Sequence, residues 1–151
     1  MTDVTFRAAR EDDLAAVVGL LADDPLGATR EHGTMADYAL AFAEIDADPN
    51  HLLLVGDVDG EVVAVLQLTF LPCLTHGGRR RAQIEGVRVA SAHRGAGLGR
   101  TMVGLAVDRA RTVGCGVVQL TTDVARPDAL RFYESLGFQP THVGLKLPLT
   151  R

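Results

Sequence analysis

The feature that most limits what this chain can fold into is a glycine-rich turn between a β-strand and a helix. It lies in residues 87–100, which read VRVASAHRGAGLGR, with β-branched residues before the turn and helically spaced apolar residues after it. Its three alternating glycines remove side chains where the helix begins. Backbone N–H groups can therefore converge on an anion, helped by the positive end of the helix dipole. Arg94 and Arg100 flank the glycines and can add charge-assisted hydrogen bonds to a phosphate.

Two other phosphate-binding motifs do not fit this turn. A P-loop needs a lysine after its last glycine, and the one lysine of the chain is Lys146. A dinucleotide fingerprint reads GxGxxG in the first β-α-β unit, whereas this turn reads GxGxG and follows a predicted antiparallel meander. A glycine-rich corner can also be only a tight connection, so the phosphate hypothesis depends on the surrounding sequence.

Charge is distributed unevenly along the chain. The formal net charge is −4, yet residues 1–78 carry fourteen acids and three arginines, while residues 79–111 carry eight arginines and two acids. The turn therefore lies in a basic segment of an acidic protein. The bases are arginines with one exception, and the planar arginine fork suits phosphate. This pattern favours a phosphorylated small molecule, whereas the net charge disfavours nucleic acid and anionic membranes as partners.

Hydrophobic periodicity and turn residues predict ten elements. In order they are a strand at 4–7, a helix beginning at 11–13 and ending at Asp24–Pro25, a helix beginning at 34–37 and ending at 48–50, a strand beginning at 52–55, a strand at 61–71, a strand at 81–89, a helix at 97–113, a strand at 117–120, a helix from 127 to 137 and a strand at 143–147. Asp59-Gly60 predicts a tight hairpin turn.

The order β-α-α-β-β-β-α-β-α-β predicts an α/β (α+β) fold with a mixed, mostly antiparallel sheet and helices on both faces. At about 150 residues per domain, residues 1–151 predict a single domain.

Cysteine and histidine usage predicts no disulfide and no metal site. Cys73 and Cys115 are 42 positions apart without a CxxC motif, and the five histidines lack metal-ligand spacing. The N-terminus carries an acid where a signal peptide needs a base, and no apolar run approaches the roughly 18 residues of a membrane span. We therefore expect a cytoplasmic protein that does not interact with membranes.

Two motifs together resemble a known family. Arg94-x-x-Gly97-x-Gly99, placed between a strand and a helix, resembles the acetyl-coenzyme A (acetyl-CoA) signature [QR]-x-x-G-x-[GA] of the GCN5-related N-acetyltransferase (GNAT) family. Residues 129–138, ALRFYESLGF, resemble that family's late motif, a helix bearing a tyrosine followed by Gly-Phe. Motif spacing, element order and length also agree, so the resemblance covers essentially the whole chain and implies a GNAT-like sheet.

The resemblance implies where acetyl-CoA would bind. Backbone N–H groups of the turn would hold its pyrophosphate. Val87 and Val89 match the strand segment that splays from the next strand, commonly at a bulge, and pairs with the pantetheine amides. The V-shaped gap between this segment and residues 117–121 would accept the thioester arm. The positions that match the pyrophosphate turn are Arg94, Gly95, Ala96, Gly97, Leu98, Gly99 and Arg100.

The resemblance also implies two catalytic residues. Tyr133 matches the tyrosine that usually protonates the coenzyme A thiolate, although a half-buried core tyrosine is the alternative. Glu85 is the candidate base; it lies two residues before Val87, which predicts the same strand face. Glu85 could instead bind the substrate ammonium through water, or be an ordinary solvent-facing glutamate. Direct transfer without an acyl-enzyme is implied.

The sequence departs from the family's pattern after residue 120. Many members carry an asparagine there that contacts the cofactor, whereas residues 121–126 read TTDVAR, which leaves Asp123 or Arg126 as replacements. The arginine run 79–81 could meet the 3′-phosphate of the cofactor or an acidic partner, but such runs are usually solvated.

Acidic residues lie where the family builds its acceptor site from the first two helices, and acidic walls suit a cationic amine. Exposed acidic helix faces are also the default for solubility, and this second interpretation is favoured. The residues concerned are Asp23, Asp24, Glu31, Asp37 and Glu44.

The leading hypothesis is an acetyl-CoA-dependent N-acetyltransferase that transfers acetyl directly to a primary amine of a small molecule. Two alternatives stay open: a non-catalytic acyl-CoA sensor on the same fold, and an enzyme that acetylates proteins or peptides. A homodimer through the last edge strand also stays open.

Overall fold

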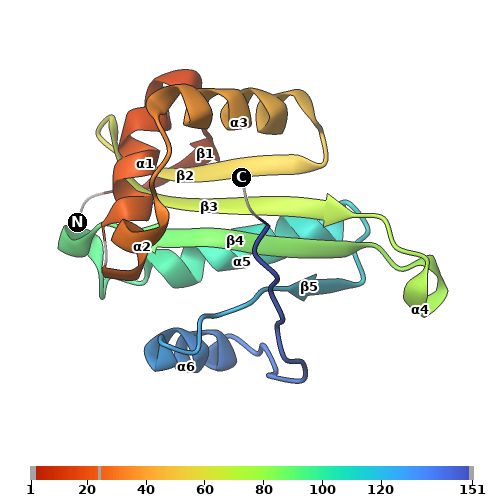
Figure 1. Cartoon of the computed structure of the whole chain (residues 1–151). Helices are drawn as coiled ribbons and strands as arrows, with labels where there is room; N and C mark the ends of the chain where they lie inside the picture. Colours follow the sequence, from red (N-terminus) through yellow and green to blue (C-terminus); the bar gives the residue numbers. More distant parts are fainter. Residues whose placement is uncertain (1–2, 24, 150–151) are drawn as a thin grey trace. The chain divides into compact units, whose positions relative to one another are not determined.

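Strand pairing in the order of the chain builds a five-stranded sheet (Figure 1). Its strands are β1 (Thr5–Ala8), β2 (His51–Val58), β3 (Glu61–Leu71), β4 (Arg81–Val89) and β5 (Val117–Gln119). The first four pair antiparallel, and β5 joins β4 in parallel after a helical crossover. The predicted mixed, mostly antiparallel sheet is confirmed.

The computed structural model describes residues 3–23 and 25–149. It divides into two compact units, Met1–Gln119 and Leu120–Arg151. The first unit contains the sheet, and the second contains the last helix. That residues 1–151 form a single N-acetyltransferase domain stays a prediction.

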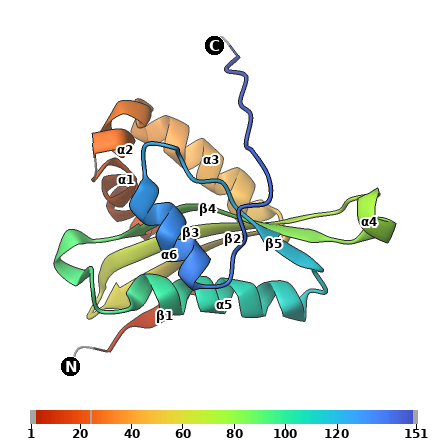
Figure 2. The ribbon, with the colours of Figure 1, turned by 90° about the horizontal axis from the view of Figure 1, so that it is seen from below.

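The helices of the first unit lie on both faces of its sheet (Figure 2). Helices α1, α2 and α3 lie on one face, and α5 lies on the other. The predicted helices are present, whereas α2 and α4 are short additions. The predicted end of α1 at Asp24 lies outside the described residues. The helices, including two 3-10 turns, are η1 (Glu11–Asp13), α1 (Leu14–Ala22), α2 (Pro25–Arg30), α3 (Met35–Ala47), α4 (Thr75–Gly78), η2 (Ser91–His93), α5 (Leu98–Thr112) and α6 (Pro127–Ser135).

The turn between β2 and β3 forms as its residues predict. Asp59 and Gly60 both have positive φ, 52° and 87°. Two successive positive φ values define a type I′ turn, whose twist matches that of the strands it joins. The pairing of Val58 with Glu61 leaves these two residues alone in the loop.

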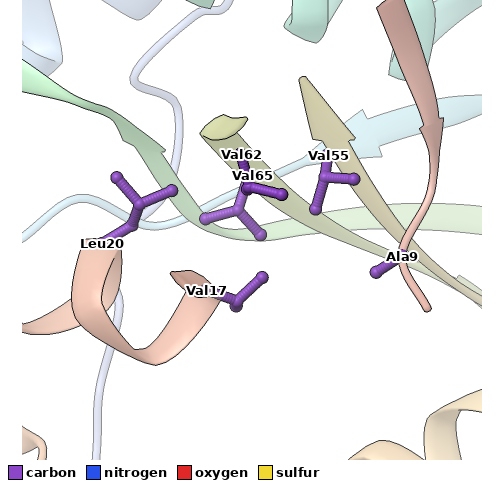
Figure 3. Close-up of a cluster of buried hydrophobic side chains, with 6 residues drawn as sticks. All are labelled: Ala9, Val17, Leu20, Val55, Val62 and Val65. Atoms are coloured by element: carbon purple, nitrogen blue, oxygen red, sulfur yellow. The ribbon is translucent and has the colours of Figure 1, made fainter. Parts of the chain in front are cut away.

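Apolar side chains from α1 and the sheet form a core cluster (Figure 3). Val17 and Leu20 of α1 are 3% and 8% exposed and pack with Val55 and Val65 of the sheet. The opposite face also packs against apolar residues: α5 buries Met102, Val103, Ala106 and Ala110. Both faces therefore have the buried area that a sheet between helices requires.

One ion cluster joins the N-terminal elements. Arg7 donates to both carboxylate oxygens of Asp13, at 2.7 and 3.0 Å, and to Asp57 at 2.9 and 3.2 Å. The backbone N–H of Arg10 also donates to Asp13. The hydrogen bonds from Arg7 lower the pKa of Asp13 to about 2 and lower the pKa of Asp57. The cluster fixes β1, η1 and β2 to one another.

The predicted last strand at 143–147 is wrong for the described residues. Residues 143–149 have no regular structure, and Val143, Leu145 and Leu147 are 86%, 90% and 85% exposed. Alternating apolar residues become a strand only where their backbone groups find a partner strand, because unpaired N–H and C=O groups gain nothing from extension.

No helix within residues 3–23 and 25–149 is long and apolar enough to cross a lipid bilayer.

Candidate active site

Strand β4 contains a bulge at Gly86. Glu85 pairs with Gln67 and Arg88 pairs with Val65, so two residues of β4, Gly86 and Val87, face one residue of β3. Gly86 has a φ of +62°, which glycine adopts without strain. The bulge implied by the family resemblance is therefore present.

The bulge reverses which backbone groups of β4 face β3. Gly116 N–H donates to Arg80 C=O at 2.9 Å, so even-numbered residues before the bulge face β5. Ala90 N–H donates to Val63 C=O at 2.8 Å, so even-numbered residues after the bulge face β3. Because backbone directions alternate along a strand, Val87 and Val89 turn their N–H and C=O groups away from β3.

Within residues 3–23 and 25–119, no strand pairs with that outward edge. Strand β5 pairs with β4 only at Arg81, Ala82 and Gln83. The backbone of Val87 and Val89 is thus an open edge, as expected for a segment that hydrogen-bonds an extended ligand.

Arginine side chains occupy the two outward carbonyls. Arg88 Nη1 donates to Val87 C=O at 2.9 Å, and Arg94 Nε donates to Val89 C=O at 3.0 Å. The sequence predicts that Arg94 lies beside a phosphate. In the structure, its side chain donates to the outward carbonyl of the strand edge. A ligand amide N–H that donates to Val89 C=O would displace the Arg94 side chain. The Arg94 guanidinium would then be available to a phosphate.

The glycine turn follows this edge directly. Gly95 and Gly97 have φ of +84° and +82°, and a Cβ at either position would touch no neighbouring atom. Backbone conformation, not crowding, therefore requires glycine there. The first N–H groups of any α-helix have no carbonyl acceptor within the helix. Gly97, the N-cap of α5, has no side chain that could accept a hydrogen bond from them. An exposed helix start without a capping side chain is a general site for anions.

Glu85 lies on the sheet face that α1 and α3 cover, and it is exposed. It shares this face with its partner Gln67 and, through Val65, with Arg88. Val89 pairs with Ala64 and so lies on the opposite face. The prediction that Glu85 and Val87 share a face is wrong, because the bulge inserts one residue into the alternation.

Tyr133 belongs to the second unit. It is half-buried on α6, and its ring makes edge contacts with Phe132 and Phe138 at centroid distances of 5.1 and 5.7 Å. Pro127 begins the helix, and Gly137, with a φ of +96°, follows its end. The helical setting of the tyrosine is as the motif predicts, and its role as an acid stays a prediction.

Asp123, one candidate for the missing asparagine, forms a local turn. Its Oδ1 accepts from Ala125 N–H at 2.8 Å, and its C=O accepts from Arg126 N–H at 2.9 Å. This carboxylate thus helps to lead the chain into α6.

The arginine run at 79–81 lies at the other end of β4 from the glycine turn. Eight residue steps of a strand span about 26 Å, which exceeds the separation of the pyrophosphate and 3′-phosphate within one coenzyme A molecule. Arg80 donates to Asn50 Oδ1 at 2.9 Å, and the Arg79 side chain lies against Gly116. A 3′-phosphate role for this run is therefore incompatible with pyrophosphate binding at the turn.

Two of the acidic residues of the first helices take part in local structure. Asp37 forms a capping box with Thr34 at the start of α3. Glu31 accepts a hydrogen bond from the Tyr38 hydroxyl, which raises the pKa of Tyr38. Asp24 lies outside the described residues.

The cysteines show no sign of activation. Both are free, and burial raises the pKa of the Cys115 thiol, which disfavours the nucleophilic thiolate. Among the residues that the structure describes, no three His, Cys, Asp or Glu side chains come together as a metal site.

A hollow of about 310 Å³ lies on the sheet face opposite Glu85, between β1–β3 and α5. It contains no candidate site residue, and its walls are largely apolar. The candidate residues of the first unit lie instead along β4 and the glycine turn. The residues that line the hollow are Phe6, Ala8, Leu52, Leu54, Leu66, Leu68, Leu105, Ala106 and Arg109.

The mixed five-stranded sheet, the edge of β4 beyond its pairing with β5 and the glycine turn before α5 match the α/β arrangement that the family resemblance implies. The chain belongs to the acetyltransferase (GNAT) family, whose sequence model matches residues 14–138. It is an acyltransferase, and the suspected resemblance is confirmed.

Three relatives illustrate the range of this similarity. Glucosamine 6-phosphate N-acetyltransferase of Trypanosoma brucei brucei is 29% identical over 152 residues, covering 99% of this chain and 98% of the relative. Aminoalkylphosphonate N-acetyltransferase of Salmonella typhimurium is 30% identical over 67% of this chain and 65% of the relative. A crystal structure described as a transcriptional regulator from Bacillus halodurans C-125 has a TM-score of 0.94 and 50% identity, covering 97% of this chain and 100% of that one.

Proposed function

We propose that this protein is an acetyl-CoA-dependent N-acetyltransferase that transfers acetyl directly to a primary amine of a small molecule. The observation that carries the proposal is the outward backbone of Val87 and Val89 beside an exposed glycine turn. An extended amide-bearing arm that ends in a pyrophosphate matches both parts of this arrangement.

The residues present fit acetyl-CoA. The N–H groups of the turn and of the first turn of α5 would bind the pyrophosphate, and Arg94 and Arg100 would add positive charge. Val87 and Val89 would pair with the pantetheine amides as an added strand does. The bound thioester supplies an activated acetyl group for attack by an amine.

Glu85 and Tyr133 are the proposed proton-transfer residues. Glu85 would accept a proton from the ammonium, directly or through water, so that the amine nitrogen has a free electron pair. As the new C–N bond forms and the C–S bond breaks, the electron pair of the C–S bond stays on sulfur. The Tyr133 hydroxyl would donate its proton to that thiolate, and the second amine proton would leave to solvent.

The names of two relatives favour a small amine as the acceptor, since both describe acetylation of small phosphorus-containing amines. A second candidate is a non-catalytic acyl-CoA sensor. It is favoured by the protein at 50% identity, which is described as a transcriptional regulator.

Thiol release from acetyl-CoA, measured over amino sugars, aminoalkylphosphonates, polyamines and peptides, tests the proposal. We expect turnover with a small amine and a higher melting temperature in acetyl-CoA. Turnover of peptides alone would instead identify a peptide-modifying enzyme. Stabilisation by acetyl-CoA without turnover of any amine would contradict the enzyme and favour the sensor.

A further inference from the structure

A patch of polar side chains lies on the same sheet face as Glu85. Directly paired residues of neighbouring strands share a face. Gln67 of β3 therefore lies beside Glu85 of β4, and Thr69 lies beside Gln83 one row further along. Glu85 is exposed, and the other three residues are half-buried.

Two further side chains hold this patch in place. His51 pairs with Thr69 across β2 and β3, and its Nδ1 lies 3.1 Å from the Thr69 hydroxyl. Gln119 pairs with Gln83 across β4 and β5, and its Nε2 donates to Gln83 Oε1 at 3.0 Å. A polar row thus crosses four adjacent strands, and each end orients a central residue.

Packing alone would favour apolar side chains at the half-buried positions of this patch. On the other face of the same strands, Leu66, Leu68, Ala82 and Ile84 are 0–2% exposed. Half-buried polar groups stabilise a protein little unless each finds a hydrogen-bond partner. Amide and hydroxyl groups that both donate and accept are suited to ligand hydroxyls.

The size of the patch limits the ligand. Neighbouring strands are about 4.8 Å apart, and successive rows on one face are about 6.7 Å apart. Four side chains at these spacings match one six-membered ring. The carboxylate of Glu85 lies at the end nearest Gly86 and the open edge of β4, where an acceptor amine would meet the thioester.

We propose that Gln67, Thr69, Gln83 and Glu85 form the floor of the acceptor site and select a primary amine carried on a hydroxyl-bearing ring, the chemistry of an amino sugar. This inference rests on the proposed function. Glu85 binds the amine, while the other three residues exchange hydrogen bonds with ring hydroxyls. His51 and Gln119 are positioning residues that orient Thr69 and Gln83.

The test compares glucosamine with cyclohexylamine, a ring of the same size without hydroxyls. Acetylation by the full chain is measured by thiol release, with rates expressed per concentration of unprotonated amine. We expect kcat/KM at least tenfold higher for glucosamine, since a site that hydrogen-bonds hydroxyls rejects an analogue lacking them.

Thr69→Val keeps the side-chain shape and removes the hydroxyl. It should lower kcat/KM for glucosamine about 3- to 10-fold, the loss expected for one uncharged hydrogen bond, and leave cyclohexylamine unchanged. Thr112→Val is the matched control, because its hydroxyl bonds only within α5, to the Asp108 carbonyl. This control should change neither substrate.

Two results separate the inference from the proposed function. Equal kcat/KM for the two amines, or an equal loss for both in Thr69→Val, would overturn the polar floor and leave the acetyltransferase proposal standing. No turnover of any amine, despite stabilisation by acetyl-CoA, would overturn the acetyltransferase proposal and this inference with it.

Discussion

Two glycines associated with α5 should respond in opposite directions to the same substitution. Gly97 is the N-cap with a φ of +82°, whereas Gly104 lies inside the helix, is exposed, and has open space around its Cα. An alanine in the left-handed region costs roughly 1–2 kcal/mol. An alanine inside a helix stabilises by roughly 0.5–1 kcal/mol relative to glycine. Gly97→Ala and Gly104→Ala should therefore differ by about 2 kcal/mol in the free energy of unfolding.

Urea denaturation of both variants measures this difference. The chain has no tryptophan, so unfolding is best followed by far-ultraviolet circular dichroism. For a protein of this size, 1 kcal/mol corresponds to about 2–4 °C in melting temperature, so the two variants should melt about 4–8 °C apart. Equal melting temperatures, or a more stable Gly97→Ala variant, would refute the left-handed conformation at the start of α5.

The same pair of variants reports on the anion site. Gly97→Ala places a methyl group where the ligand would approach, while Gly104→Ala leaves the turn intact. We expect coenzyme A to raise the melting temperature of Gly104→Ala as much as that of the wild type, and that of Gly97→Ala much less. Equal stabilisation of both variants would place the pyrophosphate elsewhere.

Three further substitutions test individual side chains. Tyr133→Phe should lower kcat by about 100-fold or more with little change in KM, the loss expected for a general acid. Unchanged kcat in steady-state kinetics would identify Tyr133 as a core residue. Glu85→Gln should lower kcat by about 100-fold or more if Glu85 is the general base, whereas a raised KM with unchanged kcat would show that it only binds the ammonium. Asp13→Asn should lower the free energy of unfolding at pH 7 by about 1–2 kcal/mol after allowance for solvent screening. Because Arg7 lowers the pKa of Asp13 to about 2, this contribution is present above an unfolded pKa of about 3.9 and is lost as the pH falls towards 2. Denaturation at pH 7 and pH 2 should therefore show a smaller stability loss at pH 2.

Elements defined by local chemistry could be predicted from the sequence. The hairpin at Asp59 and Gly60 depends on two residues that tolerate positive φ, and α5 depends on apolar residues at helical spacing. The short helices α2 and α4 could not be predicted in this way. In α4, His76 and Gly77 have φ of 54° and 74°, so the segment has no regular helical period to detect.

The last strand shows the limit of alternation as a signal. Val143, Leu145 and Leu147 have the right period, but a strand also needs a partner backbone, and pairing depends on residues far away in the sequence. Alternation alone therefore cannot predict a strand, because it does not show whether a partner strand is available.

The parts of the candidate site that form a sequence motif can be predicted from the sequence. The polar patch cannot, because it depends on the register between two strands. The glycine turn depends on the local order of Arg94 and Gly97, whereas the open edge at Val89 was implied by the family resemblance that this motif carries. The patch formed by Thr69 and Gln83 arises only when β3 and β4 align in one register. Each strand shows a polar residue at alternate positions, but nothing in either segment alone specifies its neighbour.

The bulge at Gly86 explains how one strand can serve both reactants. Before the bulge, even-numbered residues of β4 direct their backbone groups away from β3; after it, Val87 and Val89 do. Without the extra residue, both valines would bond to β3, and β4 would offer no outward carbonyls at those positions. The same insertion leaves Glu85 on the polar face while Val89 lies on the other. The thioester arm would therefore bind to the strand edge and the acceptor to its polar face, so the two ligands need not compete for the same groups.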